Sequence, residues 1–388
     1  MTLPASYSTE YADHRRASRV AAMPGRYAYA ERLVAPDRYP LPPAPHAVLV
    51  GAHGACWALC YPDRMLVVDA TGTRELAAPY GQWIGALEDD GSVRLGNRLW
   101  SERDGSRLFL RPLGRFSEPG IQLVARWHDE LWTTVVQSTG AFKPREIAVH
   151  VRSNGARIDD ETAPRWAFAQ PVDGTAAIAD DGTVLVATAD RHLHVLTRPR
   201  DLRAREPEIV ARVELPHEPY AVSAVENGFV VLSAIESAPP DPAASIGRRF
   251  GRGERRFAAS WRTEVRVLDG RGTTQSICDV GFAVLQPAVE VDRDRFVLAG
   301  RGLACVAGGK LAWTKPGNVD VYATAFGDGT LAVGLGSRIA VLDREGAALQ
   351  TMDVPDRARV VTPLAIGPDG SLAFGTTGST HVVPVSHG

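Results

Sequence analysis

The stretch AFGDGTLAVGLGSRIAVLDREG, from Ala325 to Gly346, decides the fold of this chain. It places an Asp-Gly pair between two β-prone runs, and a glycine-containing bend before a third run. Asp-Gly in this setting is a strong signal for a β-hairpin, because a type I′ turn requires positive φ at both of its central residues. The runs are rich in Val, Ala and Leu, as strands buried on both faces are. We therefore expect three consecutive antiparallel strands.

The same pattern recurs along the chain. Two further clear copies are IADDGTVLVATADRHLHVL (Ile178 to Leu196) and AIGPDGSLAFGTTGSTHVVPV (Ala365 to Val385). Weaker copies fill the intervals between them. The predicted hairpins fall near residues 53, 90, 129, 180, 227, 293, 328 and 369. Their spacing is close to the period of about 40–50 residues that is typical of propeller blades. The longest interval, between 227 and 293, contains an insertion at about 237–260.

Small four-stranded units of constant period cannot bury their faces alone. Stacking the units around a ring buries these faces. The sequence shows no amphipathic helix of normal length between the units, which argues against an alternating βαβ fold. We therefore predict an all-β chain forming a β-propeller of four-stranded blades. Eight blades are expected, or seven if the weak second and third copies share one blade. Residues 45–388 would form this single domain.

The last predicted unit supplies only three strands before the sequence ends. Residues 1–44 are interpreted as an N-terminal extension, within which RYAYAERLVA (Arg26 to Ala35) has the β-prone residues of a strand. We expect this strand to complete the last blade and to close the ring. A disordered N-terminal tail is the alternative interpretation.

The units DGTVLVATADRHLHVLTRPRD and DGTLAVGLGSRIAVLDREGAALQ resemble the quinoprotein-like (PQQ-type) and WD40-like β-propeller repeats. The resemblance covers roughly residues 45 to 388 and implies a fold, not an activity. The Trp-Asp and Gly-His pairs of regular WD40 repeats are absent from the sequence. Quinoprotein motifs survive only as ATGTREL near Thr71 and GGKLAWTKPG near Lys310. The chain is also similar to the propellers found with MoxR-type ATPases and von Willebrand A proteins in bacteria, which points to protein partners.

The composition is that of an ordinary globular protein, with 45% hydrophobic and 23% charged residues. The net charge of −2 excludes a surface that is basic throughout, so any contact with nucleic acid or with an anionic membrane would have to be local. No apolar run approaches the ~20 residues needed to cross a bilayer, and the N-terminus lacks the apolar segment of a signal peptide. We therefore predict a cytoplasmic protein without a membrane partner.

Sequence motifs for catalysis are missing. G-x-S-x-G, H-E-x-x-H and the phosphate-binding G-x-x-x-x-G-K-[ST] do not occur. His192 and His194 share one strand face and could chelate a metal ion, but no third ligand stands nearby in the sequence. WHDE (Trp127 to Glu130) is interpreted as a polar hairpin tip, and the four cysteines as buried small hydrophobes. We predict no catalytic residue, no metal and no cofactor.

One stretch departs from the even charge distribution. SIGRRFGRGERRFAASWR, from Ser245 to Arg262, holds six arginines and a single acidic residue. Arginine forks pair with carboxylates in a bidentate manner, and aromatic residues mixed with arginine are typical of interaction hot spots. The predicted binding residues are Arg248, Arg249, Phe250, Arg252, Arg255, Arg256, Phe257 and Trp261. A solvated surface loop, a nucleic-acid contact and a lid over a small anionic ligand are the other interpretations.

Two classes of function follow from these observations. The first is a non-catalytic scaffold for protein–protein interaction, in which the arginine-rich segment docks on a partner with an acidic surface, such as an ATPase-containing complex. The alternative is an enzyme acting on a small molecule, as a lyase, hydrolase or cyclase, at the mouth of the central channel. A nucleic-acid contact through the arginine-rich segment is a second alternative. A deep pocket with converging His or carboxylate groups would favour the enzyme.

Overall fold

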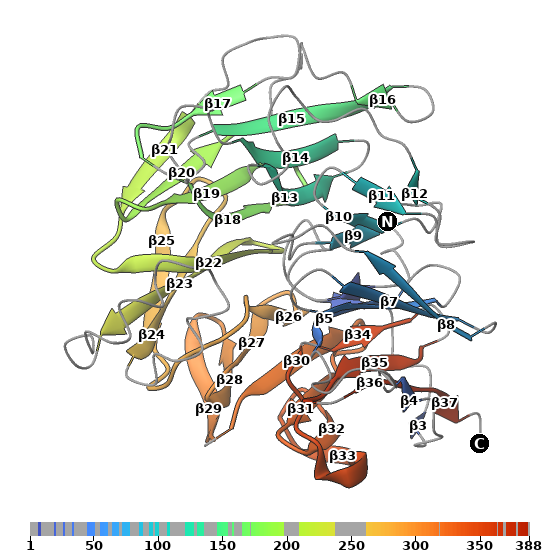
Figure 1. Cartoon of the computed structure of the whole chain (residues 1–388). Coiled ribbons are helices and arrows are strands. Elements are labelled where there is room, and N and C mark those ends of the chain that lie inside the picture. The colour runs from blue at the N-terminus through green and yellow to red at the C-terminus, as the bar shows by residue number, and fades with distance from the viewer. Residues whose placement is uncertain are drawn as a thin grey trace.

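The computed structural model shows an all-β chain whose strands pair mostly with their neighbours in sequence (Figure 1). In the part of the chain that the structure describes, the one helical element is a short 3-10 helix, η3 (Pro355–Arg357). The described residues are 7–8, 19–20, 26–27, 33–34, 45–50, 55–60, 64–69, 72–77, 85–87, 93–95, 98–100, 107–108, 121–127, 130–135, 146–153, 157–158, 165–170, 172–197, 209–236, 261–317, 319–362, 364–367, 370–377 and 379–386.

Among these residues, eight sheets of four or five strands succeed one another, and we number them in chain order. The strands of sheets 1 to 4 are β5 (Pro45–Val50), β6 (Cys56–Cys60), β7 (Arg64–Asp69) and β8 (Gly72–Ala77); β9 (Gly85–Leu87), β10 (Val93–Leu95), β11 (Arg98–Trp100) and β12 (Arg107–Leu108); β13 (Ile121–Trp127), β14 (Glu130–Val135), β15 (Glu146–Ser153), β16 (Arg157–Ile158) and β17 (Arg165–Ala167); β18 (Val172–Ile178), β19 (Val184–Thr188), β20 (His192–Leu196) and β21 (Ile209–Glu214).

The second half of the chain repeats this plan. The strands of sheets 5 to 8 are β22 (Glu218–Val225), β23 (Gly228–Glu236), β24 (Trp261–Leu268) and β25 (Thr274–Asp279); β26 (Val289–Asp292), β27 (Arg295–Ala299), β28 (Gly302–Ala307) and β29 (Lys310–Pro316); β30 (Val321–Phe326), β31 (Leu331–Leu335), β32 (Arg338–Leu342) and β33 (Ala348–Asp353); β34 (Ala365–Ile366), β35 (Leu372–Gly375) and β36 (Thr380–Val383). Short N-terminal strands join sheets 7 and 8.

Each of the eight predicted hairpins joins two strands that pair antiparallel, so the sequence located these turns correctly. The expected type I′ geometry is wrong. In the turn of residues 326–330, Phe326 donates its N–H to the carbonyl of Thr330 and accepts the N–H of Gly329. Only the glycine has a positive φ, 86°. This hydrogen-bond pattern is that of a type I turn followed by one residue in the left-handed conformation, here Gly329. Asp328 therefore keeps a negative φ.

The same hydrogen-bond pattern recurs in five turns of the described chain, each with glycine at the fourth position. Each turn has its glycine at positive φ, a conformation that glycine adopts without steric cost. The five turns are 179–183, 269–273, 326–330, 343–347 and 367–371, with the glycines Gly182, Gly272, Gly329, Gly346 and Gly370.

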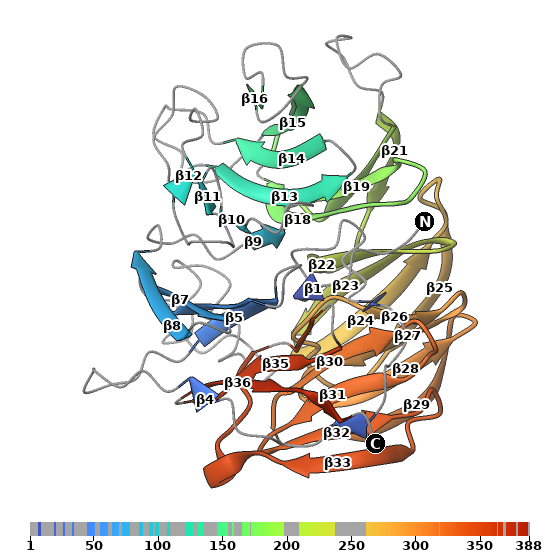
Figure 2. The ribbon, with the colours of Figure 1, turned by 90° about the vertical axis from the view of Figure 1, so that its right-hand side faces the viewer.

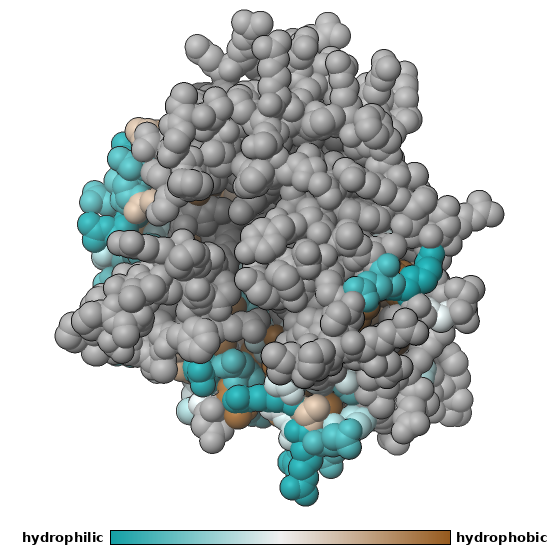
Figure 3. Space-filling model, in the orientation of Figure 1, coloured by the Kyte–Doolittle hydropathy of each residue, from teal (hydrophilic) through white to brown (hydrophobic). Residues whose placement is uncertain are grey.

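Burial decreases from the first to the fourth strand of a sheet. In sheet 7, β30 is buried along its whole length, whereas the fourth strand, β33, alternates between exposed and partly buried residues. Sheets 4 and 6 show the same contrast. A fourth strand has a neighbour on one side only, which explains exposed apolar side chains such as Leu349 at 58%. The described surface in Figure 3 is accordingly mainly hydrophilic at its margins.

Neighbouring sheets pack face to face through shared apolar clusters. Sheets 4 and 5 meet through Val195, Val222 and Phe229, and sheets 7 and 8 through Tyr322 and Phe374. Sheet 8 also packs on sheet 1, because buried residues of both contribute to one cluster. Figures 1 and 2 show this sequence of sheets around the molecule, with β34–β36 beside β5–β8.

Glycines in the turns before the fourth strands allow adjacent sheets to approach closely. A Cβ added to Gly272 of sheet 5 would lie 2.9 Å from Val195 of sheet 4. A Cβ added to Gly346 of sheet 7 would lie 3.0 Å from the Trp313 ring of sheet 6. Contacts this short force a shift of the neighbour, so these glycines serve both the turn and the packing between sheets.

Four short strands come from residues 1–44. Two of them, β3 (Arg26–Tyr27) and β4 (Leu33–Val34), lie within the predicted strand region. β4 pairs antiparallel with β36 as the fourth strand of sheet 8, and β3 pairs with β37 (Val385–Ser386). The other two, β1 (Tyr7–Ser8) and β2 (Arg19–Val20), lie on the first strands of sheets 8 and 7. No pattern in residues 1–20 predicted these last two pairings.

Consecutive four-stranded antiparallel sheets that stack face to face, buried at their first strands and exposed at their fourth, have the organisation of a β-propeller. In this arrangement, β23 and β24 are neighbours in sheet 5 and pair antiparallel. The predicted insertion at about 237–260 connects these two strands and lies outside the described residues.

Candidate functional site

The predicted binding residues belong to the connection between β23 and β24. Those from Arg248 to Phe257 lie outside the described residues. Trp261 is the first residue of β24, and its backbone pairs with Glu236 at the end of β23. The arginine-rich segment therefore remains a sequence-based prediction, but the structure describes the two strands from which it leaves.

Ion pairs surround the root of this segment. Arg262 Nη1 lies 3.0 Å from Asp279 Oδ2. Two residues further along β24, Glu264 Oε1 accepts a hydrogen bond of 3.0 Å from Arg266 Nη2, and both side chains are only 11% exposed. His217, in the connection between sheets 4 and 5, places Nε2 3.8 Å from Glu264 Oε2. The pairing of β23 with β24 runs unbroken from Phe229 to Glu236, so this root is a regular two-stranded ladder.

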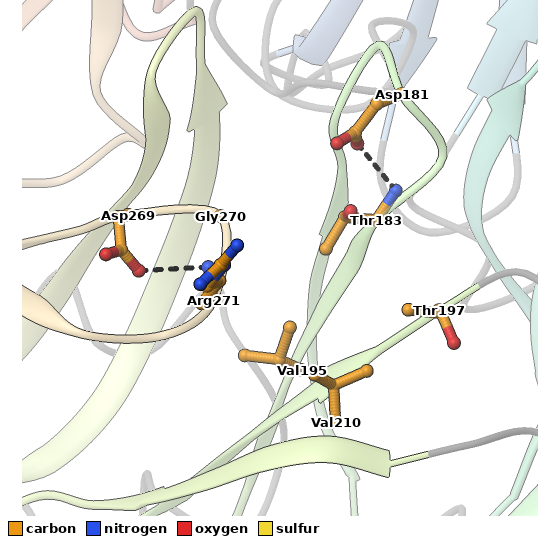
Figure 4. A pocket seen from close by; sticks show the side chains of 8 residues that line it. All are labelled: Asp181, Thr183, Val195, Thr197, Val210, Asp269, Gly270 and Arg271. Carbon is orange, nitrogen blue, oxygen red and sulfur yellow. Dashed lines mark hydrogen bonds between the residues drawn. The ribbon is translucent and has the colours of Figure 1, made fainter.

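A cavity of about 440 Å³ lies between sheets 4 and 5, beyond the opposite end of β24 (Figure 4). Val195 and Val210 form apolar lining, and Asp181, Asp269 and Arg271 bring charge to it. These residues come from the turns before β19 and β25 and from the ends of β20 and β21. The cavity thus combines an aliphatic surface with carboxylates and one guanidinium group.

The two carboxylates of this cavity complete their own turns. Asp269 Oδ1 accepts the backbone N–H groups of Thr273 at 2.8 Å and Arg271 at 2.9 Å, and these bonds lower the pKa of Asp269 below its ordinary value. Asp181 Oδ1 accepts the N–H of Thr183 at 2.9 Å. Both carboxylates therefore hold their own turns in place.

A second polar cluster, which sequence analysis missed in part, lies at the turn between β19 and β20. Thr188 Oγ1 donates to Asp190 Oδ1 at 2.6 Å. His192 Nδ1 lies 3.0 Å from Asp190 Oδ2, and Arg212 Nη2 of β21 donates to the same oxygen at 3.3 Å. Burial raises the pKa of Asp190, but Thr188, His192 and Arg212 outweigh it and hold that pKa below its ordinary value.

The turn that carries Asp190 is fixed to the next sheet. Arg191 has a φ of 64°, which is uncommon for a residue with a side chain. Its carbonyl accepts the N–H of Leu215 at 2.8 Å, and its guanidinium donates to the carbonyl of Pro216 at 3.2 Å. These bonds tie the turn to the connection between sheets 4 and 5 and hold the unusual backbone conformation in place.

His194 is the buried member of this cluster. Its Nε2 lies 3.2 Å from Thr188 Oγ1, and its ring lies against Phe168. Because the Thr188 proton is directed to a carboxylate that only accepts, His194 Nε2 must be the donor to Thr188. Nδ1 then carries a lone pair, and it has no hydrogen-bond partner. Burial lowers the pKa of His194, so the neutral ring is favoured.

Two sequence interpretations concern these elements. His192 and His194 do share one strand face, with ring centroids 6.5 Å apart. Across the described residues, no group of three or more His, Cys, Asp or Glu side chains could hold a metal ion. The WHDE stretch is a hairpin tip as predicted, because Trp127 at the end of β13 pairs with Glu130 at the start of β14.

No protein-family model and no curated protein matches this sequence. Among solved structures, the chain is similar to the crystal structure of the WD40 β-propeller domain of Doa1, at 11% sequence identity and a TM-score of 0.45. The match covers 94% of this chain and 98% of that one. A TM-score this low does not support a fold assignment. The chain is therefore classed as a β-propeller from the arrangement of its own sheets. The WD40-like and quinoprotein-like assignments remain predictions.

The described segments contain no helix that is long and apolar enough to cross a membrane. Their polar clusters serve turns and junctions between sheets: Asp269 closes a turn, Arg191 ties two sheets, and Glu264 and Arg266 form a mostly buried pair.

Proposed function

We propose that this protein is a closed, eight-bladed β-propeller that acts as a non-catalytic platform for protein–protein interaction in the bacterial cytoplasm. Three observations support the ring: the eight sheets of the described residues, the apolar cluster shared by sheets 8 and 1, and the addition of β4 to β36. Closure removes the open faces that a row of small sheets would otherwise expose.

The docking element in this proposal is the arginine-rich segment, with Arg248, Arg249, Phe250, Arg252, Arg255, Arg256, Phe257 and Trp261 as contact residues. The observation that carries it is the unbroken β23–β24 ladder, which ends at Glu236 and Trp261. The two strands pair without a break, so the long connection between them is an insertion that the sheet does not need. Long connections of this kind often have a functional role.

A protein with an acidic surface is the partner that this segment would suit. Arginine offers several donors in a planar fork, which matches carboxylates, and Phe or Trp supplies apolar area at the centre of a contact. The net charge of −2 does not provide the broad basic footprint expected of a nucleic-acid binder. Through the resemblance to propellers that accompany MoxR-type ATPases, the proposal extends to an ATPase-containing complex.

Copurification from the native cell with matched variants tests this function. The docking variant is Arg248→Ser with Arg249→Ser. The control is Arg338→Ser with Arg344→Ser, which removes the same charge from side chains that are 67% and 62% exposed on sheet 7. We expect the parent and the control to recover the same partner and the docking variant to lose it.

Salt provides a second arm of the same experiment. Contacts between exposed charges are screened as ionic strength rises, so partner recovery by the parent should fall between low and high salt. The proposal is wrong if the docking variant recovers the partner as well as the control does, or if recovery does not change with salt.

A further inference from the structure

Two short N-terminal strands lie where the sheet-forming repeats leave an edge. β30 is the first repeat strand of sheet 7, and β34 is the first repeat strand of sheet 8. Each has one side that does not face the second strand, at the edge of the sheet opposite the fourth strand. We call this the inner edge. β1 pairs antiparallel with β34, with Tyr7 opposite Ile366 and Ser8 opposite Ala365. β2 pairs with β30, with Arg19 beside Ala325 and Val20 beside Phe326.

These pairings differ from those of the repeats. β2 runs parallel to β30, whereas the strands of each repeat pair antiparallel with their neighbours. Each added strand also reaches the adjoining sheet, β1 touching β5 of sheet 1 and β2 touching β26 of sheet 6. Figure 2 labels β1 near the middle of the molecule, away from the fourth strands. The added strands therefore do not belong to a repeat and lie at two junctions between sheets.

The inner edges have a reason to recruit an added strand. All six residues of β30 and both residues of β34 are buried. An edge strand offers unpaired N–H and C=O groups, and such groups are costly to leave unsatisfied when they are buried. On β30 the Gly300 carbonyl accepts the N–H of Val321, and the side chain of Gln286 pairs with both backbone groups of Ala323, so the edge that β2 completes is the end at Ala325. Addition of an extended segment satisfies them through the main chain, which is how many proteins bind extended peptides.

From these contacts we propose that the inner edges of β30 and β34 form a strand-addition site, occupied by Tyr7–Ser8 and Arg19–Val20 of the same chain, which an extended peptide can enter only by displacing them. Each pairing involves two residues, so it is weak by itself. The covalent connection makes each pairing intramolecular, which raises the effective concentration of these segments and keeps the site filled. The docking element of the proposed function is not involved.

Disulfide trapping in the full-length protein tests whether the inner edges are occupied. Partners across a ladder have Cα atoms about 4.5–5.5 Å apart, within the range that a disulfide can bridge. We expect the pair Ser8→Cys with Ala365→Cys, and the pair Arg19→Cys with Ala325→Cys, to cross-link under mild oxidation, as read by peptide mapping. The control pair, Ser8→Cys with Thr273→Cys, joins β1 to the turn before β25 and should not cross-link.

Peptide binding then tests whether the site accepts a strand in trans. The probe is a fluorescent synthetic peptide of residues 1–24. The variant carries Tyr7→Pro, Ser8→Pro, Arg19→Pro and Val20→Pro, because proline cannot donate to a ladder. We expect the full-length variant to bind the peptide at least tenfold more tightly than the parent, whose own strands fill the site. A peptide with the same four prolines should bind neither protein.

Either experiment can overturn the proposal. Equal cross-linking of the ladder pairs and the control pair would show that β1 and β2 have no fixed place. Equal binding of the peptide to the parent and the proline variant would show that the inner edges are not a site released by displacement. The trapping result stands even if the proline variant fails to fold.

Discussion

Two buried histidines occupy corresponding places in sheets 4 and 8, and their surroundings differ. His194 and His381 both lie on the third strand of their sheet, and each places Nε2 3.2 Å from the hydroxyl of a threonine, Thr188 or Thr376. Each ring also contacts a phenylalanine. The His381 ring stacks on Phe374 at 9°, whereas the His194 ring is tilted by 59° against Phe168.

The difference shows what one carboxylate adds to such a pair. Beside His194, the Asp190 carboxylate accepts the hydrogen bond from the Thr188 hydroxyl. His194 Nε2 must then be the ring nitrogen that donates to Thr188. Beside His381, Thr376 Oγ1 accepts the N–H of Ser379 and donates to the Ser379 carbonyl at 3.1 Å, so a neutral carbonyl stands where His194 has a carboxylate. Burial lowers the pKa of both histidines, and that of His381 falls to about 4. The threonine of the first pair donates to a carboxylate, and the threonine of the second pair donates to a backbone carbonyl.

Removal of the stacked ring should have the largest effect. Phe374 is completely buried, so Phe374→Ala is expected to lower the free energy of unfolding by about 3–5 kcal/mol. Phe168→Ala should cost less, because Phe168 is 7% exposed and its contact with His194 is tilted. Urea denaturation measures both values, with Phe374→Leu as the control that keeps most of the volume. A larger loss at Phe168 would contradict the comparison.

The acid sensitivity of the protein should come more from His381 than from His194. The folded-state pKa of His381, about 4, lies below its ordinary value of 6.5, so the unfolded chain binds the proton more readily between these values. Stability is therefore constant above about pH 6.5 and falls as the pH drops toward 4, by about 3 kcal/mol for a difference of this size.

Unfolding free energies measured from pH 7 to pH 4 check this expectation. His381→Gln should flatten the profile. His194→Gln should change it less, because burial lowers the pKa of His194 by less than it lowers that of His381. If the His381→Gln profile keeps the full slope of the parent, packing around His381 does not suppress its protonation.

Asp190→Asn should disturb His194 and leave His381 unchanged. The variant loses the ion pairs of Asp190 with His192 and Arg212. The side chain at position 190 also no longer has to be the acceptor of the Thr188 hydroxyl. We expect a loss of about 1 kcal/mol in stability, since hydrogen bonds and partly exposed ion pairs contribute on this scale. The ¹⁵N shifts of the histidine rings should show mixed tautomers at His194 alone. A parent-like spectrum would refute the assigned donor.

Arg212→Ala should have the smallest effect. Its side chain is 56% exposed and lies 3.3 Å from Asp190, so salt screens the pair. The expected loss is about 0.2–0.5 kcal/mol at low salt, and it should vanish near 1 M salt. Thermal denaturation at both ionic strengths measures it, with Arg338→Ala as an exposed control. A salt-independent loss would mean that Arg212 acts by packing.

Local signals in the sequence located the hairpins, whereas hydrogen bonds across the turn decided their geometry. Asp328-Gly329 marks a reversal in either turn type, and a dipeptide does not distinguish them. The bond from Phe326 N–H to the Thr330 carbonyl closes a longer loop in which glycine alone needs positive φ. The position of the turn follows from residue type, and its form follows from the register of the strands around it.

The N-terminal strands and the Asp190 cluster show where sequence reasoning falls short. A strand of two residues such as Tyr7–Ser8 has no periodicity to detect, and its partner Ile366 is distant in the chain. For the cluster, alternate polar residues at Thr188, Asp190 and His192 were a usable signal. The participation of Arg212 depends on β21 pairing with β20 and could not be seen. The arginine-rich segment stays a prediction from composition.

The pairing of β4 with β36 has a consequence for the order in which the protein folds. Most sheets are made from neighbouring hairpins, which can form as soon as the ribosome has released them. Leu33 pairs with His381, so sheet 8 gains its fourth strand only after residue 381 has been synthesised. Until then the early sheets lack the neighbour that covers Val48 and Val50. The nascent chain therefore leaves this apolar face of sheet 1 uncovered until the strands of sheet 8 have been made.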